Sequence, residues 1–354
     1  MTRRILWALN HKTLMPDELS LLRELRFEVF CPRRLPTGVE GRGTRLDMSE
    51  ERNASLPSDA LAVLANHRFY ERRWSPTISD IINKYFDVVV TAFYPECYSS
   101  AVQNFRGLVI ARAFGREGDK TYADLIAGWG VPNLKEAIAA LGDRYIFGQA
   151  YPELQEIESP PHSKRALTIA LPAPSWVKHR IGTWRGTDRR LLFNCPLVND
   201  ASYYKQIYDG IKANFGDMPH AIFGRQNGLI SDSAVISSAS DEEVLDLFAS
   251  SAAFVYTSTE PRHLHYSPVE AIMVGTPVLY RSGALLDRLS GATLPGASSD
   301  IQEMRRKATL LISGDAVLRE EILSSQSVLL SSFSRSAALS AWERVLYTKS
   351  VGTL

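Results

Sequence analysis

The sequence predicts an α/β protein in which two domains, each built on a mainly parallel, doubly wound sheet, follow one another along the chain. Three observations support this prediction. Short apolar runs alternate with amphipathic segments over residues 5–151. A proline-rich stretch, 152–186, then interrupts the rhythm, and the alternation restarts after it. With 354 residues, the chain is long enough for two cores of ordinary size.

In the first half, apolar runs typical of buried strands lie at 5–9, 86–94, 107–114 and 144–151. Helical patterns lie between them, at 17–25, 99–105 and 133–143. In the first of these, Leu19, Leu22 and Leu25 fall on one helical face. The polar, glycine-containing stretch 34–58 predicts a long surface loop, and the apolar run 166–172 predicts an extra strand near the junction.

The second half repeats the alternation. Strands are expected at 189–198, 220–226, 252–259 and 276–282, and helices at 201–215, 240–251, 267–275 and 336–347. The second of these helices opens with a capping box, because Glu243 follows Ser240 at the required spacing.

We therefore divide the chain into an N-terminal domain, 1–175, and a C-terminal domain, 186–335. The remaining segment, 336–354, is a C-terminal helix that could pack back on the N-terminal domain. Ligands of such sheets bind beyond the carboxyl ends of the strands, at switch points and domain clefts. We expect the site in the cleft between the two domains.

Composition excludes several classes of protein. The chain has 40 basic and 39 acidic residues, a balance that argues against a dedicated nucleic-acid binder. Its three cysteines are far apart and indicate neither a disulfide framework nor a zinc site, so a reduced cytoplasmic setting is the default. No apolar run approaches the roughly 18 residues of a membrane span, so any membrane contact would be peripheral. Nucleotide-binding glycine motifs of the dinucleotide and P-loop types are absent.

Residues 263–279, HLHYSPVEAIMVGTPVL, concentrate polar groups at one end of a helix. His263, His265, Tyr266 and Ser267 lie at the predicted helix start, and Glu270 lies in its first turn. A helix N-terminus offers free N–H groups and partial positive charge to a phosphate. A carboxylate accepts two hydrogen bonds from a diol. The stretch therefore suits a phosphorylated, hydroxyl-bearing ligand.

This helix, with Pro268, Glu270, Ala271, Gly275 and the following Pro277 and Val278, is of the P-x-E-A-x-x-x-G-x-P-V type. Together with the helix and strand before it, it resembles the donor-binding half of GT-B glycosyltransferases, which have two Rossmann-like domains with a cleft between them. The resemblance implies that Glu270 holds the nucleotide ribose. It covers about 189–285 well and the first domain only by architecture.

Two departures from the common GT-B pattern bear on the donor. Many retaining members carry E-x7-E, but the first position here is Arg262, and Glu260 is two residues out of register. No D-x-D is present, so no metal is expected and no cofactor is required. A CMP-activated acid sugar needs cationic partners rather than a metal, and HLHYSP is similar to the HP-type motifs of transferases that use CMP-sialic acid or CMP-Kdo.

Taken whole, the chain looks like the retaining β-Kdo transferase modules of bacterial surface polysaccharide synthesis, including lipopolysaccharide O-antigen. The resemblance implies transfer of Kdo from CMP-β-Kdo to a glycan acceptor, by double displacement through a covalent Asp–Kdo intermediate. Such a module could work with other transferase domains of a larger protein, in the cytoplasm or at the inner face of the bacterial inner membrane. The alternatives are a GT-B transferase with a nucleotide-diphosphate hexose or rhamnose donor, a non-catalytic glycan-binding module, and an epimerase.

Three residues are the catalytic candidates. Asp232 follows the strand ending at 226 and is the candidate nucleophile, although a polar-loop aspartate is more often an Asx-turn residue. Glu158, at the domain junction, could act as acid/base, the alternative being a solvated linker glutamate. His265 could bond the donor or orient a catalytic acid.

The binding candidates lie at strand ends and at the helix start. Donor-binding candidates are Arg225, His263, Tyr266, Ser267, Glu270, Asn194 and Lys205. Arg225 could pair with a phosphate or a Kdo carboxylate, because a planar guanidinium suits both. Ser267 could donate to the phosphate, cap its helix, or do both. Acceptor-binding candidates, which follow strands of the first domain, are His11, Tyr94, Glu96 and Arg112.

Overall fold

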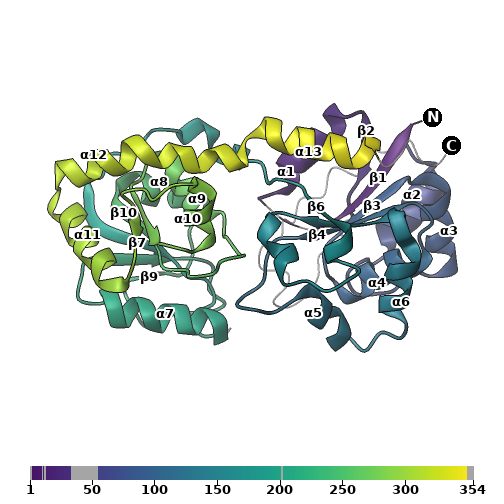
Figure 1. Cartoon of the computed structure of the whole chain (residues 1–354), viewed down its shortest axis with the longest axis horizontal. Helices are drawn as coiled ribbons and strands as arrows, with labels where there is room; N and C mark the ends of the chain where they lie inside the picture. Colours follow the sequence, from purple (N-terminus) through teal and green to yellow (C-terminus); the bar gives the residue numbers. More distant parts are fainter. Residues whose placement is uncertain (1, 10, 12, 33–54, 201, 349–354) are drawn as a thin grey trace. The chain divides into compact units, whose positions relative to one another are not determined.

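The computed structural model describes residues 2–9, 11, 13–32, 55–200 and 202–348. They form two compact units, labelled along the chain in Figure 1. Unit 1 comprises the described residues up to Pro172 and those from Ser334, and unit 2 comprises Ala173–Phe333. Each unit has one six-stranded, wholly parallel sheet with helices, so the predicted α/β fold of two Rossmann-like domains is confirmed.

Unit 1 is built on the sheet β2-β1-β3-β4-β5-β6. Its strands are β1 (Arg3–Ala8), β2 (Phe27–Phe30), β3 (Val88–Thr91), β4 (Leu108–Ala113), β5 (Tyr145–Gln149) and β6 (Ala166–Thr168). Its α-helices are α1 (Met15–Glu24), α2 (Ser58–Asn66), α3 (Pro76–Tyr85), α4 (Pro95–Asn104), α5 (Tyr122–Gly128), α6 (Leu134–Leu141) and α13 (Arg335–Thr348). Because β2 and β3 pair with opposite sides of β1, the strand order reverses between β1 and β3.

Unit 2 is built on the sheet β12-β11-β10-β7-β8-β9. Its strands are β7 (Asp188–Asn194), β8 (His220–Phe223), β9 (Val235–Ile236), β10 (Ser251–Tyr256), β11 (Val278–Arg281) and β12 (Ala297–Ser298). Its α-helices are α7 (Ser202–Phe215), α8 (Asp241–Ser250), α9 (Ser267–Val274), α10 (Leu285–Ser290), α11 (Ile301–Ser313) and α12 (Ala316–Ser325). Counted from β7, the strand order is 3-2-1-4-5-6, the dinucleotide-fold order, whose switch point lies between β7 and β10.

Local sequence signals explain several element ends. The capping box of α8 forms as predicted: the Ser240 hydroxyl accepts from the Glu243 N–H, and the Glu243 carboxylate accepts from the Ser240 N–H at 2.7 Å. Helix α9 ends where predicted, at Gly275, which has φ of +92°. This left-handed conformation suits glycine and turns the chain directly into β11.

The structure adds elements that the sequence did not predict. Strand β2 follows α1 after a turn at Arg26, which has φ of +64°. Glycine usually signals such a left-handed turn, and here an arginine takes its place.

The predicted loop 34–58 lies largely outside the described residues. The extra strand expected in 166–172 forms as β6 beside β5. Helix α13 packs in unit 1, where the Tyr347 hydroxyl donates to the Leu25 carbonyl.

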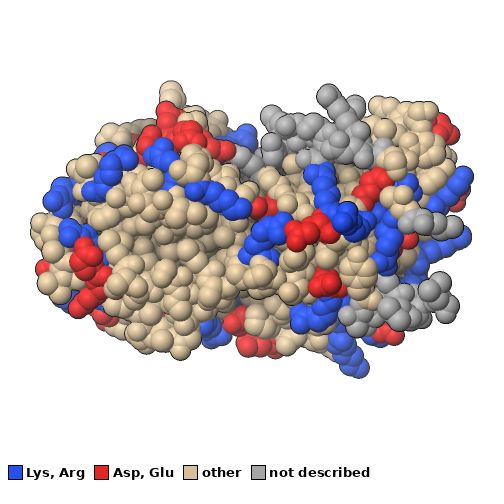
Figure 2. Space-filling view, turned by 90° about the horizontal axis from the view of Figure 1, so that it is seen from above, with Lys and Arg blue, Asp and Glu red and all other residues tan. Residues whose placement is uncertain are grey.

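Surface charge is mixed. Figure 2 shows Lys and Arg interspersed with Asp and Glu on the face that it presents, as the formal net charge of +1 leads one to expect. Within the described ranges, no helix has the length and apolar character needed to cross a membrane. In the same residues, no cluster of three or more His, Cys, Asp or Glu side chains could hold a metal ion.

Candidate functional site

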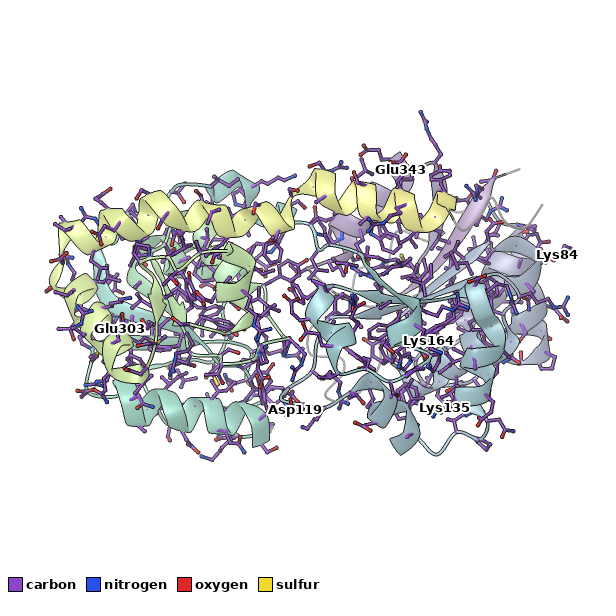
Figure 3. The ribbon with its side chains drawn as sticks, in the orientation of Figure 1. Lys84, Asp119, Lys135, Lys164, Glu303 and Glu343 are labelled. Carbon is purple, nitrogen blue, oxygen red and sulfur yellow. The ribbon has the colours of Figure 1, made fainter. Side chains whose placement is uncertain are left out.

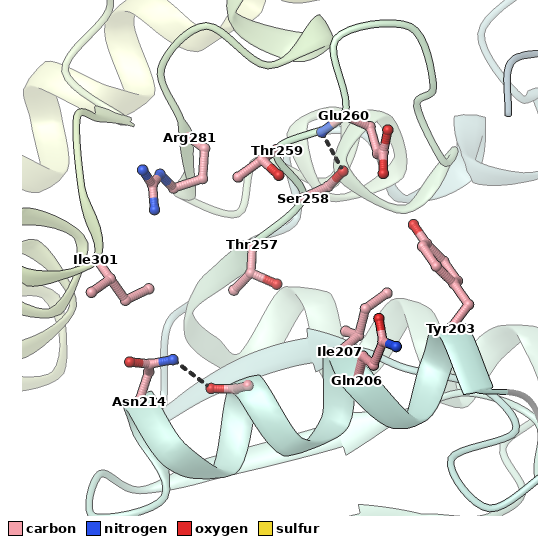
Figure 4. Close-up of a pocket in the computed structure, with 11 residues that line it drawn as sticks. Tyr203, Gln206, Ile207, Asn214, Thr257, Ser258, Thr259, Glu260, Arg281 and Ile301 are labelled. Atoms are coloured by element: carbon pink, nitrogen blue, oxygen red, sulfur yellow. Dashed lines mark hydrogen bonds between the residues drawn. The ribbon is translucent and has the colours of Figure 1, made fainter. Parts of the chain in front are cut away.

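A pocket of about 370 Å³ lies at the carboxyl edge of the unit 2 sheet, beside the switch point (Figure 4). Its walls come from α7, from the loop after β10, from the end of β11 and from the start of α11. It is lined by Tyr203, Gln206, Ile207, Gly210, Asn214, Thr257, Ser258, Thr259, Glu260, Arg281 and Ile301. Open α/β sheets bind their ligands at this kind of position.

Helix α7 supplies one wall. Tyr203, Gln206, Ile207, Gly210 and Asn214 are spaced by three or four residues, so they share one face of the helix, as Figure 4 shows for the four that it labels. The wall combines an aromatic ring, an aliphatic side chain and two amides. It also contains a glycine in a helix interior, where glycine costs roughly 0.5–1 kcal/mol relative to alanine.

Arg281, at the end of β11, supplies a cation to the pocket. Its Nη2 donates to the Ser299 carbonyl at 2.8 Å. The Ser299 N–H in turn donates to Glu303, which is labelled on α11 in Figure 3, and Lys307 pairs with the same carboxylate at 2.9 Å. Because these contacts hold Ser299, they orient the guanidinium. Its Nε is buried and has no hydrogen-bond partner among the described residues.

The loop after β10 supplies hydroxyls and one carboxylate. Thr257, Ser258, Thr259 and Glu260 all line the pocket. The Ser258 hydroxyl accepts from the Glu260 N–H at 3.2 Å, and the Glu260 carbonyl accepts from the Leu285 N–H at 2.9 Å. Hydroxyls and a carboxylate fixed in this way can hydrogen-bond to the hydroxyls of a sugar.

A smaller cavity of about 30 Å³ adjoins the pocket and shares Tyr203, Ile207, Thr257 and Ser258 with it. Asn194, at the end of β7, and His265 line this cavity. The Tyr256 hydroxyl lies 3.2 Å from His265 Nδ1 and accepts from the His265 N–H at 3.3 Å. Burial raises the pKa of Tyr256 to about 12, so its hydroxyl stays protonated at neutral pH. The structure thus brings two predicted donor-site residues to the switch point.

The loop after β10, which lines the pocket, leads directly to the start of α9. The His263 and His265 rings lie 4.6 Å apart, centroid to centroid. Tyr266 is the N-cap residue of α9, and no side chain caps the helix, so the capping alternative for Ser267 is wrong. Glu270 is buried and accepts from Trp176 Nε1 at 3.3 Å.

Asp232, the candidate nucleophile, is not among the residues that line the pocket. It precedes β9, whose Val235 pairs with Ile222 of β8. Asp232 starts the turn that leads into β9, and its carbonyl accepts from the Val235 N–H at 3.0 Å. Its carboxylate accepts from the Tyr208 hydroxyl and from the Ala234 N–H, both at 2.9 Å, which is the Asx-turn arrangement.

Asp232 is also ion-paired with Lys212 at 2.9 Å. Burial alone would raise the pKa of Asp232, but hydrogen bonds from Lys212, Ala234 and Tyr208 outweigh it and lower the pKa to about 2. Because the folded-state pKa is lowered, the carboxylate stabilises the fold above about pH 4, and this stabilisation is lost as the pH falls towards 2.

Replacing Asp232 by asparagine is therefore expected to lower the free energy of unfolding by about 1 kcal/mol at pH 7, because the charged contacts are lost. The difference from wild type should shrink at pH 3, where wild-type Asp232 begins to be protonated. Thermal melts of both proteins at pH 7, 5 and 3 measure it. A difference that is the same at all three pH values would contradict the assigned pKa.

The two other donor candidates have different outcomes. Arg225 is exposed at the carboxyl edge, two residues beyond β8, and its carbonyl accepts from the Leu197 N–H at 2.9 Å. It therefore lies at the strand end where it was expected, but it does not line the pocket, and its donor role stays a prediction. Lys205 pairs with Asp209 at 2.7 Å and follows Tyr203 by two residues, which is roughly 200° around the helix. It therefore faces away from the pocket, and its predicted role there is not supported.

In unit 1, two acceptor candidates lie at the carboxyl edge beside the switch point between β1 and β3. The His11 Nδ1 accepts from the Leu14 N–H at 3.1 Å, and burial lowers the pKa of His11 to about 4, so its ring is neutral at pH 7. The Tyr94 hydroxyl donates to the Leu9 carbonyl at 3.1 Å. Glu96, in the first turn of α4, pairs with Arg73 at 3.3 Å.

Arg112 is not an acceptor-binding residue, because its side chain is fully buried inside unit 1. It pairs with the buried Glu18 at 2.6 Å and donates to the carbonyls of Gly148 and Ile169, both at 3.0 Å. Trp7 Nε1 donates to the same glutamate at 3.0 Å. Arg112 was a candidate because it follows the apolar residues 107–111, but it lies within β4 rather than at the strand end.

Glu158 is buried rather than solvated, and its contacts differ from those expected of an acid/base. Its carboxylate accepts from the N–H groups of Tyr122 and Ala123, at 2.6 and 3.2 Å, and so caps the start of α5. His162 Nδ1 lies 3.4 Å from the same carboxylate. Each oxygen of the Glu158 carboxylate therefore accepts a hydrogen bond from the backbone at the start of α5.

Replacing Glu158 by glutamine is expected to lower the free energy of unfolding by about 1–2 kcal/mol, because an amide has one acceptor oxygen for two helix N–H groups. Thermal denaturation measures this loss. Glu156→Gln is the matched control, since Glu156 is exposed and close in sequence. An acid/base role would instead show as lost turnover with an unchanged melting temperature.

The pocket residues that the sequence did not single out are Tyr203, Gln206, Ile207, Gly210, Asn214, Thr257, Ser258, Thr259, Arg281 and Ile301. One signal was present in the predicted helix 201–215, whose polar and apolar residues recur at helical spacing. The pocket residues from the loop after β10, from β11 and from α11 meet α7 only because of the order of the strands in the sheet. Of these strands, β7 and β10 are neighbours although they are far apart in sequence. Glu260 was considered only as part of an E-x7-E pattern, yet it lines the pocket.

The order of the strands, the two units and the site at a switch point define the GT-B class of fold. No protein-family model and no curated protein matches the chain. Solved structures of GT-B glycosyltransferases do match over nearly its whole length. The two-domain α/β fold of this chain is therefore the fold of that class.

Three individual structures illustrate the likeness. Anabaena Alr3699/HepE, solved with UDP and glucose, has a TM-score of 0.59 and 13% identity over 99% of this chain and 100% of that one. A UDP-forming α,α-trehalose-phosphate synthase from Burkholderia xenovorans has a TM-score of 0.54 and 11% identity, covering 99% and 98%. A Thermobaculum terrenum O-GlcNAc transferase mutant has a TM-score of 0.55 and 14% identity, covering 100% and 69%. At these identities the likeness establishes the fold alone.

Proposed function

We propose that this protein is a glycosyltransferase that takes a hexose from a nucleotide-diphosphate donor and transfers it to a glycan acceptor. The observation that carries the proposal is the pocket at the switch point of the unit 2 sheet, which combines the Arg281 cation with the hydroxyls and carboxylate of the 257–260 loop. A guanidinium suits a diphosphate, and the loop suits sugar hydroxyls. The fold supports the proposal, because similar structures were solved with UDP or UDP-glucose.

The acceptor belongs, in this proposal, at the carboxyl edge of the unit 1 sheet, near His11, Tyr94 and Glu96. Because Nδ1 of the neutral His11 ring accepts from the Leu14 N–H, its proton is on Nε2, which can donate a hydrogen bond to an acceptor hydroxyl. Its pKa of about 4 makes it a weak base at neutral pH, so we assign it a binding role.

Transfer of Kdo from CMP-β-Kdo, by double displacement through an Asp–Kdo intermediate, is the finer donor hypothesis. It is supported by the HLHYSP stretch and by Arg262 at the first E-x7-E position. It has less support than a nucleotide-diphosphate donor, because several similar structures were solved with UDP or UDP-glucose and because the proposed nucleophile, Asp232, does not line the pocket.

A donor panel tests the proposal. The purified chain is incubated with UDP-glucose, UDP-N-acetylglucosamine, dTDP-rhamnose and freshly made CMP-Kdo, each with and without candidate glycans, and the released nucleotide is measured. Release of UDP or dTDP that increases with an acceptor supports the proposal. Release of CMP alone would replace it by the Kdo hypothesis. Conversion of a donor without acceptor would indicate an epimerase, and glycan binding without nucleotide release a non-catalytic module.

A further inference from the structure

Gly210 is unexplained by the packing of unit 2. It lies in the interior of α7, where alanine would form a more stable helix. A methyl group built on Gly210 would meet no atom within 4 Å. Two other glycines of unit 2 have an evident reason: at Gly216 the added carbon would collide with the Lys212 carbonyl, and Gly275 has a left-handed φ. Gly210 has neither reason, and it lines the pocket.

We infer that Gly210 keeps bare backbone in the pocket wall so that the flat nucleobase of the donor can lie against α7. This inference rests on the proposed function and adds the part of the donor that this wall recognises. A ring lying on the backbone here would have Tyr203 and Ile207 towards one end of the helix and Asn214 towards the other. These neighbours offer aromatic and aliphatic contact of the kind that bases use for stacking.

The amides of the same face supply the polar partners. Asn214 Nδ2 donates to the Gly210 carbonyl at 2.8 Å, a bond that fixes the orientation of this amide. Gln206, one turn earlier, carries a second amide on the pocket side. Each amide has donors and an acceptor, which match the N–H and C=O groups on the edge of a base. A phosphate would instead require cations, and this wall of the pocket has none.

The test compares Gly210→Ala with wild type by calorimetric titration with UDP, uridine and pyrophosphate. We expect the affinities for UDP and uridine to fall about tenfold, because one methyl group occupies the space of the ring, and that for pyrophosphate to stay unchanged. The melting temperature should not fall, since alanine favours the helix. Gly128→Ala is the matched control: Gly128 ends α5 in unit 1, and an added methyl group there also meets nothing within 4 Å.

The outcomes separate the inference from the proposed function. If wild type binds UDP and Gly210→Ala binds it equally well, the inference is wrong and the function stands. If wild type binds neither UDP nor uridine but releases another nucleoside diphosphate in the donor panel, the function stands, and equal release of that nucleotide by Gly210→Ala overturns the inference; if no donor in the panel is turned over, both are wrong. If Gly210→Ala does not fold, Gln206→Ala carries the same test with Lys205→Ala as its control on the opposite face of α7, and an unchanged uridine affinity in Gln206→Ala overturns the inference.

Discussion

Replacing Arg112 by methionine is expected to lower the free energy of unfolding of unit 1 by about 3–5 kcal/mol, the loss typical of removing one partner of a buried ion pair. The reason is that Glu18 would keep its charge in a fully buried position without its cation. The carbonyls of Gly148 and Ile169 would lose a donor as well. Because proteins of this size are stable by only about 5–15 kcal/mol, unit 1 of the variant should unfold at a much lower temperature.

Urea denaturation followed by circular dichroism measures this loss. The double variant Arg112→Met with Glu18→Leu should recover part of it, because replacing both members of a buried pair is far less costly than removing one. Arg106→Met is the control, since Arg106 is an exposed arginine of the same unit. If Arg112→Met melted like wild type and lost only glycan binding, the acceptor role predicted from the sequence would be right and the structural assignment wrong.

The elements and their ends were largely predictable because their causes are local. The capping box of Ser240 and Glu243 and the glycine that ends α9 are short-range signals, and both are confirmed. Strand β2 was missed because it follows α1 through a left-handed Arg26 rather than a glycine. Arg112 was misplaced because an arginine inside an apolar run has two explanations, a strand end or a buried ion pair, and only tertiary contacts distinguish them.

The site was less predictable because it depends on the lateral order of the strands. Asn194 and His265 belong to distant segments that meet because β10 pairs with β7, and no local pattern specifies this pairing. Asp232 shows the converse. It lies late in the connection between β8 and β9, where its carboxylate forms an Asx turn with Ala234 and pairs with Lys212, and the strand order does not bring it into the pocket.

The site also shows how the fold can position a positively charged side chain. Arg281 is held through Ser299 by Glu303, whose pKa is lowered to about 2 by hydrogen bonds from the Ser299 N–H, Lys307 and the Ser299 hydroxyl. The supporting carboxylate therefore remains ionised over the whole physiological pH range, and the guanidinium stays oriented. Such preorganisation reduces the entropy that a cation loses on binding a phosphate.

Replacing Arg281 by alanine should accordingly weaken UDP binding about 10–100-fold, which corresponds to the roughly 1.5–3 kcal/mol of a hydrogen bond to a charged group. Arg281→Lys should recover only part of the affinity, because an ammonium lacks the planar fork that matches a diphosphate. Titration with UDP at two salt concentrations measures both effects, and the salt dependence should be smaller in the alanine variant. Arg319→Ala, at a partly exposed position of α12, is the charge-matched control. Uridine binding should be unaffected by Arg281→Ala, so an equal loss for uridine and UDP would place Arg281 away from the phosphates and contradict its assignment.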